Sequence, residues 1–359
     1  MIHLYVASYG ESDKKGIYLV DYDEKKESFK LVKHIETNDF PSYIIRDEDV
    51  LYVALKSSNL NGVKGLRESI KKLKNNDTSL GGGLASYKIE KDDLKELSHF
   101  DSNGRSYTHL ALSNDKKEIF TANYHVGATA SYRLKDHKID SKIGAIHHTG
   151  LGPDPLKRQT GPHAHNVGIT PDKKYVYSVD LGADKVVMYT CKDGVLKEDE
   201  KHTLNVVPGA GPRHMIFSKD GKYAYIICEI SNIVIVYSYK DGFFTIIQII
   251  RCVPRHFHGF SSAAAIKMTD DGNYLFVSNR GHNSIVLYRI CKETGRLSLL
   301  YMVHTSGEPR DFSIVDDKYL FVGCEDTNVI QTMTFNAKKE ELRSIEAIME
   351  VPKPVCICK

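Results

Sequence analysis

The chain has 359 residues, 41% of them hydrophobic, and a formal net charge of +3 from 49 basic and 46 acidic side chains. This composition is ordinary for a globular protein and excludes a disordered or fibrous one. The near balance of charge predicts neither a nucleic acid nor a membrane as partner, and no apolar run approaches the roughly 20 residues of a membrane-spanning helix.

The N-terminal part predicts two pairs of strands. The first pair is HLYVASYG from His3 and GIYLVDYD from Gly16, and the second lies in PSYIIRDEDVLYVALKSS from Pro41, where a polar turn separates two apolar runs. Residues 58–83 then interrupt the pattern with a polar, glycine-rich insertion. We expect a surface loop there, which either overhangs a pocket or only decorates the rim of the fold.

From Arg105 onward one unit recurs in degenerate form. A short apolar strand leads to a polar turn such as PDKK or KDGK, then to a second apolar strand such as YVYSVD, and after a tight loop to a third strand. The copies begin at Arg105, Gly161, Gly211, Ser261 and Glu308. A repeat of roughly 40–50 residues with four short strands is typical of a β-propeller blade.

The two ends of the chain complement each other. The N-terminal residues supply a second and a third strand but no first, whereas VPKPVCICK from Val351 resembles a first strand with nothing after it. We therefore predict an all-β fold, a seven-bladed β-propeller formed by residues 1–359 as one domain. Its ring closes when the C-terminal strand completes the blade of the N-terminal strands, which protects edges that would otherwise be open.

The seven cysteines are scattered and include no CxxC pair. The sequence starts MIHLYVASYG and enters a strand pattern without a secretory leader. These features predict reduced thiols and a cytoplasmic protein.

Equivalent positions of different blades converge around the axis of a propeller, so residues far apart in sequence can form one site. In the first strands the charged or histidine positions are His163, His165, Arg213, His214, Arg310 and Asp311. The second strands end at Tyr9, Lys56, Tyr124, Leu181, Glu229, Arg280 and Glu325, and of these positions Glu229, Arg280 and Glu325 are the site candidates. Charged groups that face a confined channel cost desolvation energy unless they pair or bind a ligand, so this set predicts a functional site.

The pair His163 and His165 allows three interpretations, because residues i and i+2 of a strand share a face. They are a metal pair, an acid–base pair, or hydrogen-bonded structural histidines. The sequence offers no clear third metal ligand in a second HxH or HExxH motif, so we predict no metal. It also has no P-loop, no GxSxG, and no GxGxxG before a helix, so we predict no cofactor.

The stretches PHAHN, PDKKYVYSVDLGADKVVMY, GPRHMIFSKDGKYAYIICE, DGNYLFVSNRGHNSI and EPRDFSI resemble the seven-bladed lactonase family. That family includes propeller-type 6-phosphogluconolactonases and fungal carboxy-muconate lactonizing enzymes. The resemblance is detailed from Gly161 to Val329 and looser over residues 1–150, and Ala164 replaces the second proline of the usual PHPH motif. By resemblance to the muconate enzymes, the catalytic set is His165, Arg213, Glu229 and Arg280.

The resemblance implies hydrolysis of a sugar-acid lactone, above all 6-phosphoglucono-δ-lactone of the oxidative pentose phosphate pathway. His165 or Glu229 would take a proton from water, one arginine would stabilise the oxyanion, and another would hold the phosphate. Further residues expected to bind the substrate are His163, His214, His282, Arg310 and Glu325.

Two other functions stay open at this point. The chain is either another lactonase or muconate-type lactonizing enzyme with a different acid, or a propeller that only binds a ligand or a protein, because fold does not fix function. The binding-scaffold hypothesis predicts that His165, Arg213, Glu229 and Arg280 do not converge in one cleft.

Overall fold

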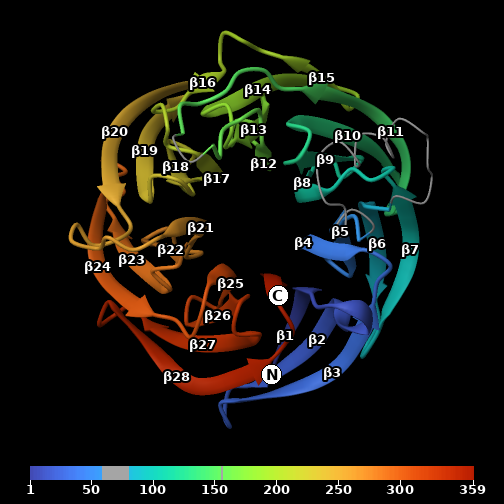
Figure 1. Cartoon of the computed structure of the whole chain (residues 1–359), viewed down its shortest axis with the longest axis vertical. Coiled ribbons are helices and arrows are strands. Elements are labelled where there is room, and N and C mark those ends of the chain that lie inside the picture. The colour runs from blue at the N-terminus through green and yellow to red at the C-terminus, as the bar shows by residue number, and fades with distance from the viewer. Residues whose placement is uncertain (59–80, 155–156) are drawn as a thin grey trace.

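A computed structural model describes residues 1–58, 81–154 and 157–359. Most of the predicted inserted loop, residues 59–80, lies outside the described residues. The described residues form seven antiparallel sheets arranged as blades around a central axis (Figure 1). This confirms the predicted all-β, seven-bladed propeller.

Each blade runs from an inner to an outer strand. Blade 1 consists of β29 (Pro354–Cys358), β1 (Ile2–Tyr9), β2 (Lys15–Asp23) and β3 (Ser28–Glu36). Blade 2 consists of β4 (Phe40–Asp47), β5 (Val50–Lys56), β6 (Gly83–Ile89) and β7 (Leu94–Asp101). Blade 3 consists of β8 (Tyr107–Leu112), β9 (Glu118–Asn123), β10 (Ala128–Lys135) and β11 (Lys138–His147). Blade 4 consists of β12 (Ala164–Ile169), β13 (Val176–Asp180), β14 (Lys185–Lys192), β15 (Val195–Glu198) and β16 (Leu204–Asn205). Blade 5 consists of β17 (Pro212–Phe217), β18 (Tyr223–Cys228), β19 (Ile233–Lys240) and β20 (Phe243–Arg251). Blade 6 consists of β21 (Ser262–Met268), β22 (Tyr274–Arg280), β23 (Ser284–Ile290) and β24 (Leu297–His304). Blade 7 consists of β25 (Pro309–Val315), β26 (Tyr319–Cys324), β27 (Val329–Asn336) and β28 (Glu341–Glu350). A single 3-10 turn, η1 (Ser12–Lys14), precedes β2.

The second strands are largely buried, and β18 and β26 are the most apolar of them, because both of their faces are covered by neighbouring blades. All six residues of β26, YLFVGC, are buried. The core lies between the blades, and one cluster joins Val234 and Val236 of blade 5 to Ala263 and Val277 of blade 6. A run of apolar residues without polar alternation is what a strand buried on both faces requires.

The ring is closed as predicted. β29 pairs with β1 in antiparallel register, with Val6 opposite Ile357. The backbone N–H of Ile357 also donates to Oδ2 of Asp311 in blade 7 at 3.1 Å. The closing strand is therefore bound to blade 1 by the sheet ladder and to blade 7 by a buried carboxylate.

The path of the chain divides the propeller into two faces. The loops from second to third strands and the connections between blades lie on one face, here called the connection face. The turns from first to second and from third to fourth strands lie on the other, here called the turn face. Within residues 1–58, 81–154 and 157–359, no helix has the length and apolar character needed to cross a membrane.

Candidate active site

The starts of the first strands and the ends of the second strands meet at the mouth of the channel on the connection face. Glu229 follows β18 of blade 5 and is buried there. Its Oε2 lies 3.0 Å from Nε of Arg213 on β17 and 3.1 Å from Nη2 of Arg280 at the end of β22. Its Oε1 accepts a hydrogen bond of 2.5 Å from Nη2 of Arg158. These four residues are called the Glu229 cluster below.

The three guanidinium groups keep Glu229 ionised. Burial alone would raise the pKa of the Glu229 carboxyl, but the charges of Arg280 and Arg213 hold it well below its ordinary value. Burial, and then the charge of Arg280, lower the pKa of Arg213 to about 9, so this guanidinium is still charged at neutral pH. A carboxylate in such surroundings is a poor proton acceptor and a good anchor for arginines.

His165 lies beside this cluster on β12, and its side chain is packed among aromatic rings. Its ring centroid is 5.2 Å from that of His214 and 5.8 Å from that of Tyr124. Its Nδ1 is buried and has no hydrogen-bond partner among the described residues. Burial and the charge of Arg213 hold the pKa of His165 well below its ordinary value. The imidazole is therefore neutral at neutral pH and able to accept a proton.

A second group of charges surrounds Tyr9 on the other side of the mouth. Nη1 of Arg310 lies 2.9 Å from Oε2 of Glu325, and the Arg310 guanidinium lies 5.5 Å from the centre of the Tyr9 ring. Nζ of Lys56 lies 5.2 Å from the same ring. Burial and the charge of Arg310 lower the pKa of Lys56. These four residues are called the Tyr9 cluster below.

Lys56 differs from the other cations of the mouth because, in the described part of the chain, no carboxylate forms an ion pair with it. Arg310 links the two clusters, since its charge also contributes to the lowered pKa of His165, after burial and Arg213. Figure 1 shows β5, which ends at Lys56, across the ring from β22, which ends at Arg280. The mouth thus has a lysine without a direct carboxylate partner within the described ranges, at the end of a strand across the ring from the end of β22.

The channel below the mouth is narrow. His165, Arg213, His214 and Arg310 line a cavity of about 20 Å³, together with Tyr9 and neighbouring residues of blades 1, 2, 3 and 7. A volume of this size holds about one water molecule. A sugar-sized ligand must therefore bind above it, at the mouth.

The other sequence-predicted residues take different places. His163 stacks on Tyr124 with ring centroids 4.3 Å apart, and its Nδ1 lies 2.8 Å from the Tyr124 carbonyl oxygen, so it borders the mouth. Asp311 lies 3.0 Å from Nζ of Lys267. His282 packs against Phe257 and bonds to Ser284, and the structure does not bring it to either cluster.

Four further residues at the mouth were not assigned a role from sequence. Tyr9, Lys56 and Tyr124 do stand at second-strand ends, so the repeat marks their positions. Arg158 lies in the irregular connection between blades 3 and 4, where the repeat gives no signal. The connection is held in place by hydrogen bonds from the Arg158 N–H to Asp154 at 2.6 Å and from Gln159 to the Leu181 carbonyl at 2.8 Å.

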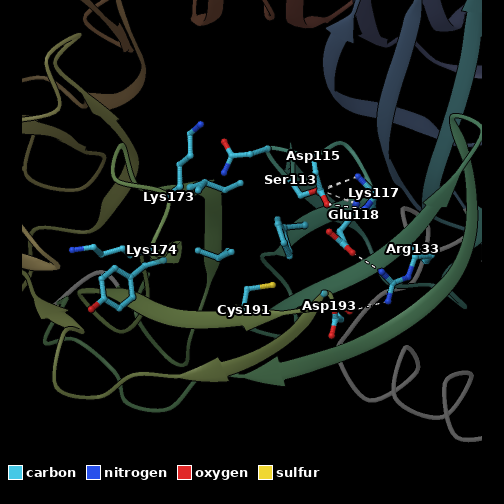
Figure 2. A pocket seen from close by; sticks show the side chains of 15 residues that line it. Ser113, Asp115, Lys117, Glu118, Arg133, Lys173, Lys174, Cys191 and Asp193 are labelled. Carbon is cyan, nitrogen blue, oxygen red and sulfur yellow. Dashed lines mark hydrogen bonds and ion pairs between the residues drawn. The ribbon is translucent and has the colours of Figure 1, made fainter.

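A larger groove lies between blades 3 and 4, but on the turn face. Its volume is about 420 Å³, and Figure 2 shows its lining side chains. Arg133 donates to Glu118 and to the Asp193 carbonyl oxygen, and Lys174 pairs with Asp241 at the groove's edge. Because these charges are paired and the turn face is opposite the mouth, the groove is separate from the candidate site.

The described residues contain no group of three or more His, Cys, Asp and Glu side chains that could hold a metal ion. The side chains at the mouth are arginines, a lysine, an ionised carboxylate and a neutral imidazole. This set can bind an anion, stabilise an oxyanion and move a proton.

Comparison with known proteins gives concordant results. A family model described as "Lactonase, 7-bladed beta-propeller" matches residues 3–358. A 6-phosphogluconolactonase of Bacillus subtilis is 34% identical over 98% of this chain and 97% of that protein. A candidate 6-phosphogluconolactonase of Bacteroides fragilis has a solved structure that is 29% identical, with a TM-score of 0.85 and coverage of 99% and 96%. A periplasmic gluconolactonase of Pseudomonas aeruginosa is 26% identical, with a TM-score of 0.88 and coverage of 99% and 98%.

Proposed function

The chain belongs to the lactonase family of seven-bladed β-propellers and is a lactone-hydrolysing enzyme, and on that basis we propose that it opens 6-phosphoglucono-δ-lactone to 6-phosphogluconate. The binding-scaffold hypothesis predicted that the four catalytic candidates lie apart. Instead, Arg213 and Arg280 both contact Glu229, and His165 lies close enough to them for the charges of Arg213 and Glu229 to act on its pKa, after burial.

The excess of positive charge at the mouth carries the proposal for a phosphorylated substrate. The Glu229 cluster has three arginines and one carboxylate, and the Tyr9 cluster has two cations and one carboxylate. Buried or half-buried like charges are costly unless an anion compensates them. A phosphate dianion supplies that compensation, whereas an unphosphorylated sugar lactone is neutral.

Lys56 and Arg310 are the groups that we assign to the phosphate. Lys56 has no carboxylate partner among the described residues, and its pKa is lowered by burial and by Arg310, so a bound dianion would stabilise its charged form. Arg310 adds a planar guanidinium that suits phosphate oxygens. The lactone ring then extends across the mouth toward the Glu229 cluster.

The remaining residues are assigned to the reaction at the lactone carbonyl. His165 accepts a proton from a water molecule as the water oxygen bonds to C1. Arg213 and Arg280 stabilise the oxyanion, and Glu229 holds their side chains in place. The bond from C1 to the ring oxygen then breaks, the proton passes from His165 to that oxygen, and 6-phosphogluconate leaves. Proton transfer of this kind contributes about 10²–10⁴ in rate.

Two further expectations follow from this substrate. The enzyme serves the oxidative pentose phosphate pathway, and it works in the cytoplasm, because a phosphorylated lactone does not cross a membrane unaided. A second candidate substrate is unphosphorylated gluconolactone, which the similarity to the Pseudomonas aeruginosa gluconolactonase favours.

The test follows the opening of freshly generated 6-phosphoglucono-δ-lactone against its spontaneous hydrolysis. We expect the wild type to accelerate it, His165→Ala to lose about 10²–10⁴ of that acceleration, and His256→Ala, an exposed histidine, to keep it. If His165→Ala keeps the acceleration, a residue other than His165 must act as the general base. Acceleration of gluconolactone alone would overturn the phosphorylated substrate but not the lactonase.

A further inference from the structure

The outer strands of blades 5 and 6 differ from all other outer strands. Five outer strands expose charged side chains, namely Lys30 and Lys33 on β3, Lys95 and Glu96 on β7, Lys138 and Asp140 on β11, Lys197 and Glu198 on β15, and Arg343 and Glu346 on β28. By contrast, residues 243–250 of β20, FFTIIQII, and residues 297–303 of β24, LSLLYMV, contain no charged side chain. These two strands occupy neighbouring positions on the rim (Figure 1).

The exposed side chains of these strands form one apolar surface. Phe243, Ile246 and Ile249 of β20 and Leu299 and Tyr301 of β24 are each between 42% and 53% exposed. They are called the apolar rim below. A groove of about 810 Å³ lies where β20 and β24 meet the connection between their blades, and its lining is mainly apolar but includes Arg251 and Arg255.

The two strands are fixed to each other, so the apolar rim is already formed. The side-chain amide of Gln248 on β20 donates to the Leu297 carbonyl at 2.9 Å and accepts from the Leu297 N–H at 2.7 Å. This pair of bonds crosses the boundary between the blades. No rearrangement is needed before another surface docks.

The apolar rim is a surface that natural proteins normally protect. β20 is the last strand of its sheet, so one side of its backbone is unpaired. Exposed, uncharged edge strands pair with other chains, and charges are the usual means of preventing this. The five exposed side chains present apolar area on the order of 500 Å², a size at which surface patches are often functional.

We infer that a second copy of this chain covers the apolar rim, with the two β20 strands antiparallel about a twofold axis. Antiparallel pairing of a strand with itself is self-complementary, as a twofold interface must be. In such a pair Arg251, the charged residue at the end of β20, lies near the opposite end of the partner strand and meets no like charge, whereas the charges of β3 and β28 are spread along those strands. The apolar rim would form the core of an interface. The polar residues around it would raise the buried area toward the roughly 800 Å² per partner of a stable complex.

This dimer leaves the catalytic mouths open, because the rim lies at the circumference and the mouth opens on the connection face. The inference therefore does not depend on which lactone is the substrate. Lactonase activity can serve as a measure of correct folding in variants of the rim.

The test is the mass of the full chain in solution, measured by sedimentation velocity and light scattering over a wide range of concentrations. We expect twice 40.5 kDa for the wild type. Ile246→Lys should be a monomer that keeps lactonase activity. The matched control Leu31→Lys, which changes an exposed leucine of β3 in blade 1, should stay a dimer.

Amide hydrogen exchange provides a second readout if Ile246→Lys does not fold. In the wild type, amides of β20 should exchange more slowly at high than at low concentration, while those of β28 should not change. A wild-type mass of 40.5 kDa at every concentration would overturn the inference, whatever else the rim binds. An Ile246→Lys protein that dimerises like the wild type would also overturn it.

Discussion

Replacing Lys56 with glutamine removes the one cation of the mouth that has no carboxylate partner in the described part of the chain. Glutamine is one atom shorter than lysine and can still donate a hydrogen bond, but it carries no charge. A hydrogen bond to a charged group contributes about 1.5–3 kcal/mol, which corresponds to a loss of about 10–150-fold in affinity. We expect KM for 6-phosphoglucono-δ-lactone to rise by this factor, with a much smaller change for unphosphorylated gluconolactone.

The assay is steady-state hydrolysis of both lactones, corrected for spontaneous opening, with inorganic phosphate as a competitive inhibitor. Phosphate should inhibit the wild type more strongly than Lys56→Gln. Lys173→Gln is the matched control, since Lys173 is exposed on the turn face, opposite the mouth. Equal rises in KM for both lactones would refute the assignment of the phosphate, because a general loss of binding does not depend on the phosphate charge.

Three other predictions follow from the buried charges. The rate at saturating substrate should stay close to its maximum well below pH 6.5 and fall only when His165, whose pKa burial and Arg213 hold down, becomes protonated. A pH–kcat profile checks this, and an acid limb of kcat near pH 6.5 would contradict it. Glu229→Gln should destabilise the fold by about 3–5 kcal/mol, because it leaves buried guanidinium groups unpaired, and urea unfolding should show the loss; an unchanged midpoint would contradict it. The free energy of unfolding should decline as pH falls from 6.5 toward 4.5, because unfolding lets His109, His165 and His214 bind protons that the folded state excludes. Burial and Arg213 lower the pKa of His109 to about 3, and the slope is about 1.4 kcal/mol per pH unit for each histidine. Melting temperatures that do not change over this range would count against it.

The architecture could be predicted from sequence because it repeats. Buried second strands such as β18 and β26 are apolar throughout, and seven such runs at regular intervals leave few alternatives to a propeller. The closure by β29 could also be predicted, since the chain lacks one first strand at its start and has one to spare at its end.

The site could be predicted only where the repeat locates it. Glu229 and Arg280 stand at equivalent second-strand ends of blades 5 and 6, and Arg213 stands at the start of the neighbouring first strand, so their convergence follows from the symmetry of the fold. Arg158 stands in a connection without a repeat position, so the repeat does not predict its contact with Glu229. His282 was predicted to bind the substrate but does not reach the site. It lies two residues after Arg280, where the chain has already turned, and its ring packs against Phe257.

The pairing of β1 with β29 also sets an order on biosynthesis. β1 is among the first strands to leave the ribosome and β29 is the last of the described strands to do so, so β1 lacks its inner neighbour during almost all of translation. At 5–20 residues per second this interval lasts between about 15 and 70 s. Blade 1 therefore gains its inner strand only after residues 2–353 have been made, and until then the inner edge of β1 has no partner strand in its own sheet.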